Sequence, residues 1–272
     1  MDLVSNEGKP SVLYHYTDQP GLLGILQYKK LWMTHHAFLN DANEIRYSKP
    51  LMKQVVAEME DRIPDNSFQD WMDGFDVRED RLKDQTYIVC FSSRGDQLSQ
   101  WRAYANDGAG FTIGISNSIL EHLAGEQGWC FGPQRVVYDR QLQIELMRNA
   151  INQGFAGHAG ELIEFWDSLL EAHAMNFKDA AFSEESEWRM NSIFINTGKH
   201  TDAPPTPSPM YRSTKYGLAP YVELSIPANA IVEIVVGPKS PMRNKHWVLR
   251  QILEANGITN PVKLTNSSAA YR

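Results

Sequence analysis

Short apolar runs recur along the chain with amphipathic helical patterns between them, and this alternation limits the fold more than any other feature. The runs that predict strands lie at 12–16, 31–34, 86–92, 111–115, 136–138, 183–195, 221–224, 231–236 and 262–264. Short runs rich in Val, Ile and aromatic residues are typical of strands. Because strands and helices are not segregated and no internal repeat is visible, the sequence predicts one mixed α+β domain over residues 1–272.

Two stretches indicate helical insertions into this domain. The first, about 50–84, is acidic, and the second, about 141–180, carries an apolar stripe at 162–170. Such a stripe is more often part of a core than a cofactor-binding surface. Residues 198–210 are rich in proline, which cannot join a sheet ladder, so they predict a mobile loop.

Composition narrows the classes of protein to consider. Hydrophobic residues make up 42% of the chain and charged residues 22%, enough for a sizeable core. The formal net charge of −7 gives no broad footprint for a phosphate backbone, although a local basic patch could persist within it.

Targeting signals and disulfides are not indicated. No apolar run reaches the roughly 18 residues of a spanning helix, and residues 1–10 lack the apolar core of a signal peptide. The two cysteines, Cys90 and Cys130, do not form a disulfide framework, and Cys90 lies in an apolar run. We therefore expect a cytoplasmic protein without a membrane partner.

Common cofactor motifs are missing from the sequence. There is no phosphate-binding loop, and the glycines of 108–114 match only part of the dinucleotide spacing and lead into a strand. There is no paired-cysteine zinc pattern, and His35 and His36 would point to opposite faces of a strand. No metal is predicted from these patterns.

The stretch 183–190, Ser-Glu-Glu-Ser-Glu-Trp-Arg-Met, carries the strongest chemical signal. As a strand it places Glu185, Glu187 and Arg189 on one face. Repulsion between the carboxylates can raise one pKa, and the guanidinium lowers it again. In a cleft this set would be an acid/base or charge-stabilising device. The alternative is a solvated helix with Ser183 as N-cap.

Other polar and aromatic residues lie in or beside the predicted strands: His15, Ser92, Trp101, Tyr104, and the group Asn40, Asp41 and Glu44. Each also has a structural interpretation. His15 could be a satisfied core residue and Ser92 a turn residue. Trp101 and Tyr104 could wall a pocket for a flat ring or simply pack. The third group could bind a metal or a sugar, or cap a helix.

Several motifs follow one order along the chain: Leu13-Tyr14-His15-Tyr16-Thr17, Leu31-Trp32, Leu39-Asn40-Asp41 with Glu44, Cys90-Phe91-Ser92, Trp101 with Tyr104-Ala105, Gly110-Phe111 with Gly114, Glu185-x-Glu187-Trp188-Arg189, Ile234 to Gly237-Pro238, and Tyr271-Arg272. In this order they resemble a bacterial family named only as domain of unknown function 2971. The resemblance covers nearly the whole chain.

The same order is similar, more distantly, to the ADP-ribosyltransferase fold. That similarity implies central, largely antiparallel, split β-sheets with flanking helices, and NAD as substrate. It assigns catalytic roles to Glu187 on the nicotinamide ribose, Glu185 on the acceptor and Ser92 in steadying the site. It assigns NAD contacts to His15 on the adenosine-side ribose, to Tyr16 or Tyr104 on nicotinamide, and to the neighbouring Thr17, Trp101 and Arg189. Cys90-Phe91-Ser92 departs from the Ser-Thr-Ser of the arginine-specific transferases.

Three functions remain open from the sequence. The first is an NAD-consuming enzyme that transfers ADP-ribose to an unknown protein or nucleic acid, or hydrolyses NAD, as a toxin or phage-defence enzyme would. The second is a metal-dependent hydrolase or nuclease built from His15, Asp41, Glu44 and Glu187. The third is a non-catalytic nucleotide-binding or sensor module.

Overall fold

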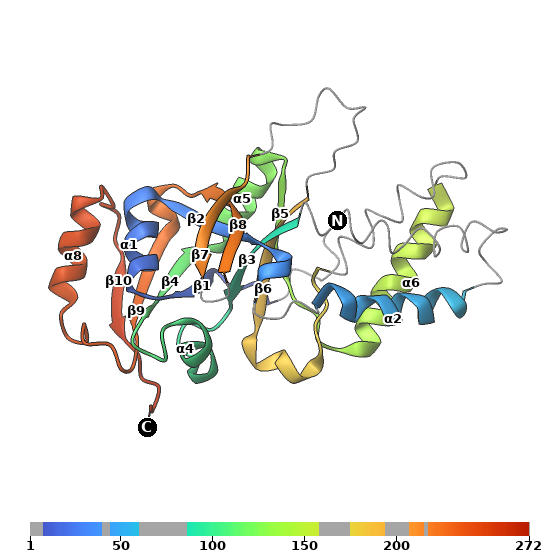
Figure 1. Ribbon diagram of the computed structural model, residues 1–272, viewed down its shortest axis with the longest axis horizontal. Coiled ribbons are helices and arrows are strands. Elements are labelled where there is room, and N and C mark those ends of the chain that lie inside the picture. Colours follow the sequence, from blue (N-terminus) through green and yellow to red (C-terminus); the bar gives the residue numbers. More distant parts are fainter. Residues whose placement is uncertain are drawn as a thin grey trace.

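The protein is a mixed α+β structure with a large, mostly antiparallel sheet (Figure 1). The computed structural model describes residues 8–39, 44–59, 86–157, 175–193, 207–214 and 217–271. The strands are β1 (Val12–Thr17), β2 (Lys30–His35), β3 (Thr86–Ser92), β4 (Phe111–Ser116), β5 (Cys130–Arg135), β6 (Glu187–Ile193), β7 (Met210–Thr214), β8 (Gly217–Ser225), β9 (Ile231–Val236) and β10 (Lys263–Asn266). The helices are α1 (Gln19–Tyr28), α2 (Glu44–Ala57), α4 (Leu98–Tyr104), α5 (Asn117–Gln127), α6 (Arg140–Gly157) and α8 (His246–Ala255), with short 3-10 helices η1 (His36–Phe38), η3 (Ala180–Glu185) and η4 (Ala228–Ala230).

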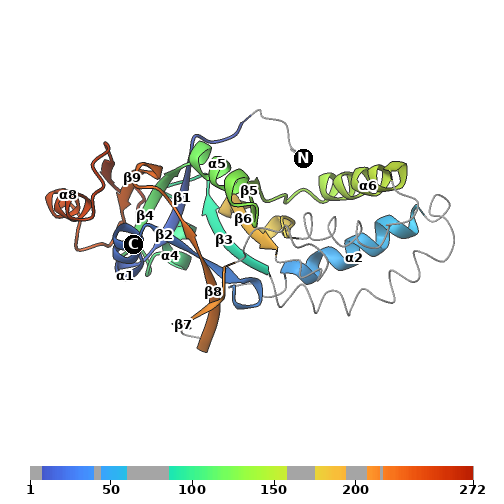
Figure 2. The ribbon, with the colours of Figure 1, turned by 90° about the horizontal axis from the view of Figure 1, so that it is seen from above.

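The sheet forks at β3. One edge of β3 pairs along its length with β6. The other edge of β3 is shared by two strands. β2 pairs near the start of β3, where Thr34 lies opposite Ile88, and β1 pairs at the end of β3, where Tyr14 lies opposite Ser92. Two wings result, a first wing of β1, β4, β9 and β10 and a second wing of β2, β8 and β7. Figure 2 shows β8 and β7 extending away from the first wing.

This topology confirms the predicted fold class. All described strand pairs are antiparallel except that of β9 with β10. The split expected from the family similarity takes the form of one sheet whose two wings separate at β3.

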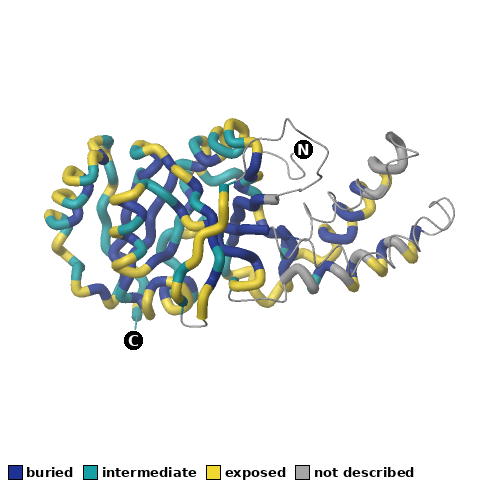
Figure 3. Tube along the Cα trace, turned by 45° about the horizontal axis from the view of Figure 1, so that its top comes forward, coloured by how far each residue is buried: buried dark blue, intermediate teal, exposed yellow. Residues whose placement is uncertain are grey.

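Apolar side chains pack on both faces of the first wing. Figure 3 shows that many residues of this part of the chain are buried. Leu13 of β1 joins the main core, to which α1, α5 and α8 contribute buried residues. Tyr14 and Tyr16 alternate with Leu13 along β1, so they lie on its opposite face. They join a smaller cluster around Trp101 of α4. The alternation of β1 therefore places α4 on the opposite side of the sheet from the main core.

Two strand predictions and the predicted loop need correction. Residues 136–138 form no strand, since Val137 makes only a single bridge to Phe177. The true strand is β5, hidden in the sequence by Gly132-Pro133, where the pairing with β6 shifts register. β6 begins at Glu187 instead of 183 because Asp179 caps the preceding η3 helix. Met210, placed in the proline-rich loop 198–210, already belongs to β7.

Helices α2 and α6 lie side by side at one end of the molecule (Figures 1 and 2). The hydroxyl of Tyr47 donates to Gln143 at 3.2 Å, and Arg140 donates to Gln54 at 3.0 Å. The two helices contain the described helical parts of the predicted insertions, although α2 begins before residue 50. Residues 60–84 of the first insertion, 158–174 of the second and 198–206 of the loop lie outside the described residues. Residues 175–179, placed in the second insertion, are not helical. The single-domain organisation stays a prediction.

No helix within the described ranges has both the length and the apolar character needed to cross a membrane.

Gly110 fixes how closely α4 approaches β1. A β-carbon on Gly110 would lie 2.2 Å from the carbonyl oxygen of Thr17 and 2.9 Å from that of Ala105. Both are backbone atoms that cannot turn aside. We predict that Gly110→Ala lowers the free energy of unfolding by more than about 2 kcal/mol in urea denaturation.

Gly125 of α5 provides the matched control, because a methyl group added there would have no atom within 4 Å. Gly125→Ala should stabilise the protein by roughly 0.5–1 kcal/mol, since alanine is the better helix former. Equal effects of the two substitutions would contradict the role given to Gly110.

Candidate functional site

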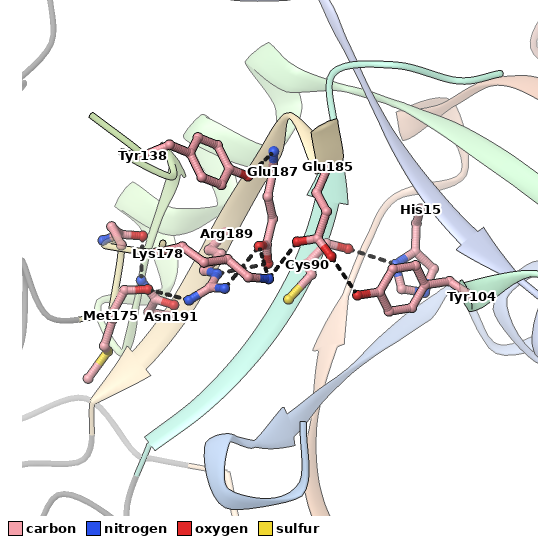
Figure 4. Close-up of polar contacts among 11 residues, drawn as sticks. His15, Cys90, Tyr104, Tyr138, Met175, Lys178, Glu185, Glu187, Arg189 and Asn191 are labelled. Carbon is pink, nitrogen blue, oxygen red and sulfur yellow. Dashed lines mark hydrogen bonds and ion pairs between the residues drawn. The ribbon is translucent and has the colours of Figure 1, made fainter. Parts of the chain in front are cut away.

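Four charged side chains meet on one face of β6 and form what we call the acid cluster: Lys178, Glu185, Glu187 and Arg189 (Figure 4). The register of β6 places Glu187 opposite Ser92 and Arg189 opposite Cys90 of β3. Trp188 and Met190 face the other way, into the main core. The alternation predicted from the sequence therefore accounts for Glu187 and Arg189.

Glu185 joins the cluster by a different route. It is the last residue of η3, and Ser186 after it adopts a left-handed conformation with φ of 47°. This turn lets Glu185 reach the amine of Lys178, to which Glu187 is also bound at 3.2 Å. The strand interpretation of 183–190 therefore holds from Glu187 onward. The alternative of a helix capped by Ser183 is wrong, because Asp179 caps η3 and Glu185 is its last residue.

The Glu187–Arg189 ion pair is buried and bidentate. Arg189 donates from Nε to Oε1 of Glu187 at 2.8 Å and from Nη2 to Oε2 at 2.9 Å. Its Nη1 donates to the carbonyl of Met175 at 2.7 Å. The side chains of Arg189 and Glu187 are only 1% and 8% exposed. Removing one partner of such a pair would leave an uncompensated charge in the interior.

The two glutamates differ in how much acceptor capacity they retain. A carboxylate offers about four lone-pair sites. Two bonds from Arg189 and one from Lys178 use three of those of Glu187, and the thiol of Cys90 acts on the same carboxylate. Glu185 accepts only from Tyr104 and Lys178 among the described residues, and its side chain is 17% exposed. Glu185 is therefore the carboxylate able to accept further hydrogen bonds.

The same surroundings separate the two pKa values. Burial acts to raise the pKa of Glu187, but the charge and hydrogen bonds of Arg189, together with Lys178, outweigh it and lower that pKa to about 2. Burial raises the pKa of Glu185, and the charge of Glu187 adds to this, against the lowering influence of Lys178. Paired acids with pKa values pushed apart are typical of sites where one group stays charged and the other titrates.

Two tyrosines complete the shell around the acids. The hydroxyl of Tyr104 donates to Glu185 at 3.0 Å, and that of Tyr138 accepts the backbone N–H of Glu187, also at 3.0 Å. Burial raises the pKa of both tyrosines, so both keep their protons. Tyr104 is 37% exposed, and Tyr138 is exposed to a smaller extent.

His15 of β1 and Glu187 of β6 lie at opposite edges of β3, and Cys90 of β3 lies between them. The Nδ1 of His15 is 3.0 Å from the carbonyl oxygen of Cys90, whose side chain acts to lower the pKa of Glu187. A carbonyl can only accept, so Nδ1 carries the proton. Burial lowers the pKa of His15, and the nearby Arg212 adds to this. The imidazole is therefore neutral, and within the described residues no donor occupies its Nε2 lone pair.

Ser92 positions Glu185 through the backbone. Its hydroxyl donates to the carbonyl of Glu185 at 2.7 Å and accepts from the N–H of Arg94 at 3.1 Å. Ser92 thus fixes the end of η3 against the end of β3, and its hydroxyl acts on the backbone of Glu185 instead of on its carboxylate.

Tyr16, Thr17 and Trp101 lie apart from the acid cluster. Tyr16 donates to the carbonyl of Arg94 at 2.8 Å and accepts from Gln97 at 2.9 Å. Its ring meets that of Trp101 edge-on at 5.0 Å. Trp101 has no exposed surface, so it packs instead of walling a pocket. Thr17 is buried at the end of β1.

Of the residues named for a metal site, only His15 and Glu187 have side chains that the structure describes. In the described part of the chain, no three side chains of His, Cys, Asp or Glu gather in a way that could hold a metal ion. Asn40 and Asp41 and the side chain of Glu44 lie outside the described residues.

Sequence reasoning missed Lys178, Tyr138 and the polar role of Cys90. Lys178 fell in a predicted helix, and Tyr138 in a predicted strand. The sequence of Met175-Asn176-Phe177-Lys178 shows no period that would mark the lysine as buried. Only one signal in the sequence indicated a buried cation such as Lys178. The run of acids at 184–187 needs a cation nearby if water does not solvate it.

Comparison with known proteins gives one family match and one distant structure. Residues 100–190 match the model of a family described as "Protein of unknown function (DUF2971)", which confirms the resemblance over that range. No curated protein matches. A solved structure, Thermus sp. 2.9 DarT in complex with NAD+, matches with 16% identity over 95% of this chain and 96% of that chain, at a TM-score of 0.35. A TM-score this low transfers no site.

The two glutamates should differ in what they contribute to stability. We predict that Glu187→Gln lowers the free energy of unfolding by about 3–5 kcal/mol, because Arg189 would be left buried without its counter-charge. Glu185→Gln should change it by less than about 1 kcal/mol, because burial already disfavours the charged form of that group. Urea denaturation at neutral pH measures both. Equal losses would show that both acids are structural.

Proposed function

We propose that the protein is an NAD-consuming enzyme that breaks the bond between nicotinamide and ribose and passes ADP-ribose to an acceptor. One observation carries the proposal. Glu185 is a carboxylate with half of its acceptor sites open, and it is held beside Glu187, whose pKa is lowered to about 2. The neutral His15 lies one strand away. Such an arrangement suits a reaction that creates positive charge on a sugar.

The reaction balances with the groups present. The bond from C1′ of the ribose to the nicotinamide nitrogen breaks, and nicotinamide leaves with the electron pair, which neutralises its ring. C1′ becomes oxocarbenium-like, and a lone pair of the acceptor or of water forms the new bond and releases a proton. A carboxylate beside C1′ stabilises the transition state more than the ground state.

We assign the carboxylate that meets the ribose to Glu185. The sequence-based hypothesis gave this role to Glu187 and the acceptor to Glu185. Because Arg189 and Lys178 occupy the oxygens of Glu187, we propose that Glu187 acts by positioning the cluster. Glu185 then both bonds a ribose hydroxyl and faces the acceptor.

The other contacts follow from hydrogen-bond chemistry. The Nε2 lone pair of His15 would accept from a hydroxyl of the adenosine-side ribose, as the family similarity implies. The partly exposed ring of Tyr104 could stack on nicotinamide while its hydroxyl holds Glu185. Tyr16, Trp101 and Ser92 support this surface by fixing the segment 92–97.

The acceptor and the biological role belong to the same proposal. A protein, a nucleic acid or water would each complete the reaction, and a toxin or phage-defence role is compatible with all three. NAD is the ligand named for the DarT structure, but with a TM-score of 0.35 our proposal is supported by the side chains of this chain instead.

Nicotinamide release from NAD tests the reaction. We predict that Glu185→Gln slows release by a factor on the order of 10²–10³, the usual loss when a charge-stabilising group is removed. Glu184→Gln, a change at the exposed neighbouring position, should leave the rate unaltered. A rate in Glu185→Gln equal to that of Glu184→Gln would remove Glu185 from the mechanism.

Ligand binding separates the alternatives. If NAD binds, a concentration of 100 times its Kd should stabilise the fold by about 2.7 kcal/mol. Stabilisation without nicotinamide release would favour a non-catalytic nucleotide-binding module. Cleavage of nucleic acid that needs a divalent ion and ignores NAD would favour the hydrolase alternative.

A further inference from the structure

Arg212 lies on the second wing among aromatic side chains. Strand pairing places Tyr221 opposite Thr34, and Trp32 lies two residues from Thr34, so these three share one face of the sheet. Arg212 of β7 pairs with Ala219 of β8 and joins that face. No motif in the sequence marks Arg212 for a role.

The guanidinium of Arg212 is fixed on two sides. Its Nη2 donates to the hydroxyl of Thr34 at 2.7 Å, and its carbon lies 5.3 Å from the centre of the Trp32 ring. Tyr221 packs against that same ring at 4.6 Å. A guanidinium held in this way loses little conformational freedom when it binds a further partner.

Arg212 has no carboxylate bound to it in the described part of the chain. Its Nε is buried without a hydrogen-bond acceptor there, and its Nη2 donates to a neutral hydroxyl. Asp18 acts on it at a distance, but the Asp18 carboxylate caps α1 by accepting from Gly21. A partly buried cation that lacks a counter-ion is costly, and binding an anion would remove that cost.

We propose that Arg212 is the receptor for a phosphate group, and specifically for the diphosphate of a nucleotide ligand. A planar guanidinium with open donors matches phosphate oxygens, and its bonds to them are charge-assisted. The diphosphate assignment rests on the proposed NAD reaction, whereas phosphate binding does not.

The position of Arg212 beside His15 supports a nucleotide. Arg212 is bonded to Thr34, which pairs with Ile88 of β3, and the carbonyl of Cys90, two residues further along β3, accepts from His15. The charge of Arg212 also acts on the His15 imidazole. The neutral His15 accepts from hydroxyls, and the cationic Arg212 donates to anions. A nucleotide presents a ribose hydroxyl and a phosphate as near neighbours, so it would satisfy both groups at once.

The site is tested by calorimetric titration with inorganic pyrophosphate and with ADP-ribose. Salt at about 150 mM suppresses unspecific electrostatic attraction between the protein and these anions. The wild type should bind both. Arg212→Gln should weaken both by about 10–100-fold, the effect of losing charge-assisted hydrogen bonds. Arg250→Gln, a change at an exposed position of α8, should bind as the wild type does.

Two further variants guard against a simple loss of folding. Arg212→Lys keeps the charge without the planar fork and should bind more weakly than the wild type. Thr34→Val keeps the shape of a buried strand residue, removes the bond that orients Arg212, and should also weaken pyrophosphate binding. Pyrophosphate affinity unchanged in folded Arg212→Lys and Thr34→Val, or no binding by the wild type, would overturn the proposal.

The outcome is separable from that of the proposed reaction. If the protein releases nicotinamide but its pyrophosphate affinity does not depend on Arg212, the proposed reaction is supported and the Arg212 site is excluded. Pyrophosphate binding that depends on Arg212, in a protein that never consumes NAD, would support the phosphate site and remove the reaction. If duplex DNA or RNA binds through Arg212 while pyrophosphate and ADP-ribose do not, the nucleotide assignment is overturned.

Discussion

The buried pairing of Glu187 with Arg189 is the interaction on which the candidate site depends. A guanidinium inside the fold requires a counter-charge, and the bidentate contact supplies it on the same strand. Both oxygens of Glu187 are engaged. Lys178 bonds one of them and also holds a second acid, Glu185, in the same cluster. One carboxylate is thereby fixed and ionised, and the other keeps capacity for a ligand.

The forked sheet explains how distant parts of the chain reach this cluster. β3 is the common neighbour of β6, which carries Glu187, and of β1, which carries His15. Cys90 lies between the two, where its side chain acts on Glu187 and its carbonyl accepts from His15. The second wing leaves from the same strand and brings Arg212. Under our proposals a nucleotide would extend from Glu185 past His15 to Arg212.

Local patterns predicted much of the fold and part of the site. The apolar run 86–92 matches β3, and the alternation of Glu187, Trp188 and Arg189 correctly separated a polar face from a core face. β5 was missed because Gly132-Pro133 interrupts its pattern. The partners Lys178 and Arg212 could not be predicted, because burial of a lone cation depends on contacts between segments distant in sequence. The depressed pKa of Glu187 has the same origin.

Carbon-13 NMR of the glutamate side-chain carboxyls, titrated with acid, tests the division of roles between the two acids most directly. Assignment follows from the signal lost in Glu185→Gln and in Glu187→Gln. We predict that Glu185 takes up its proton above the ordinary glutamate pKa and that its signal moves when NAD is added. Glu187 should stay ionised until the pH approaches its pKa of about 2. If Glu187 titrates like an ordinary glutamate and responds to NAD while Glu185 does not, that division of roles is contradicted.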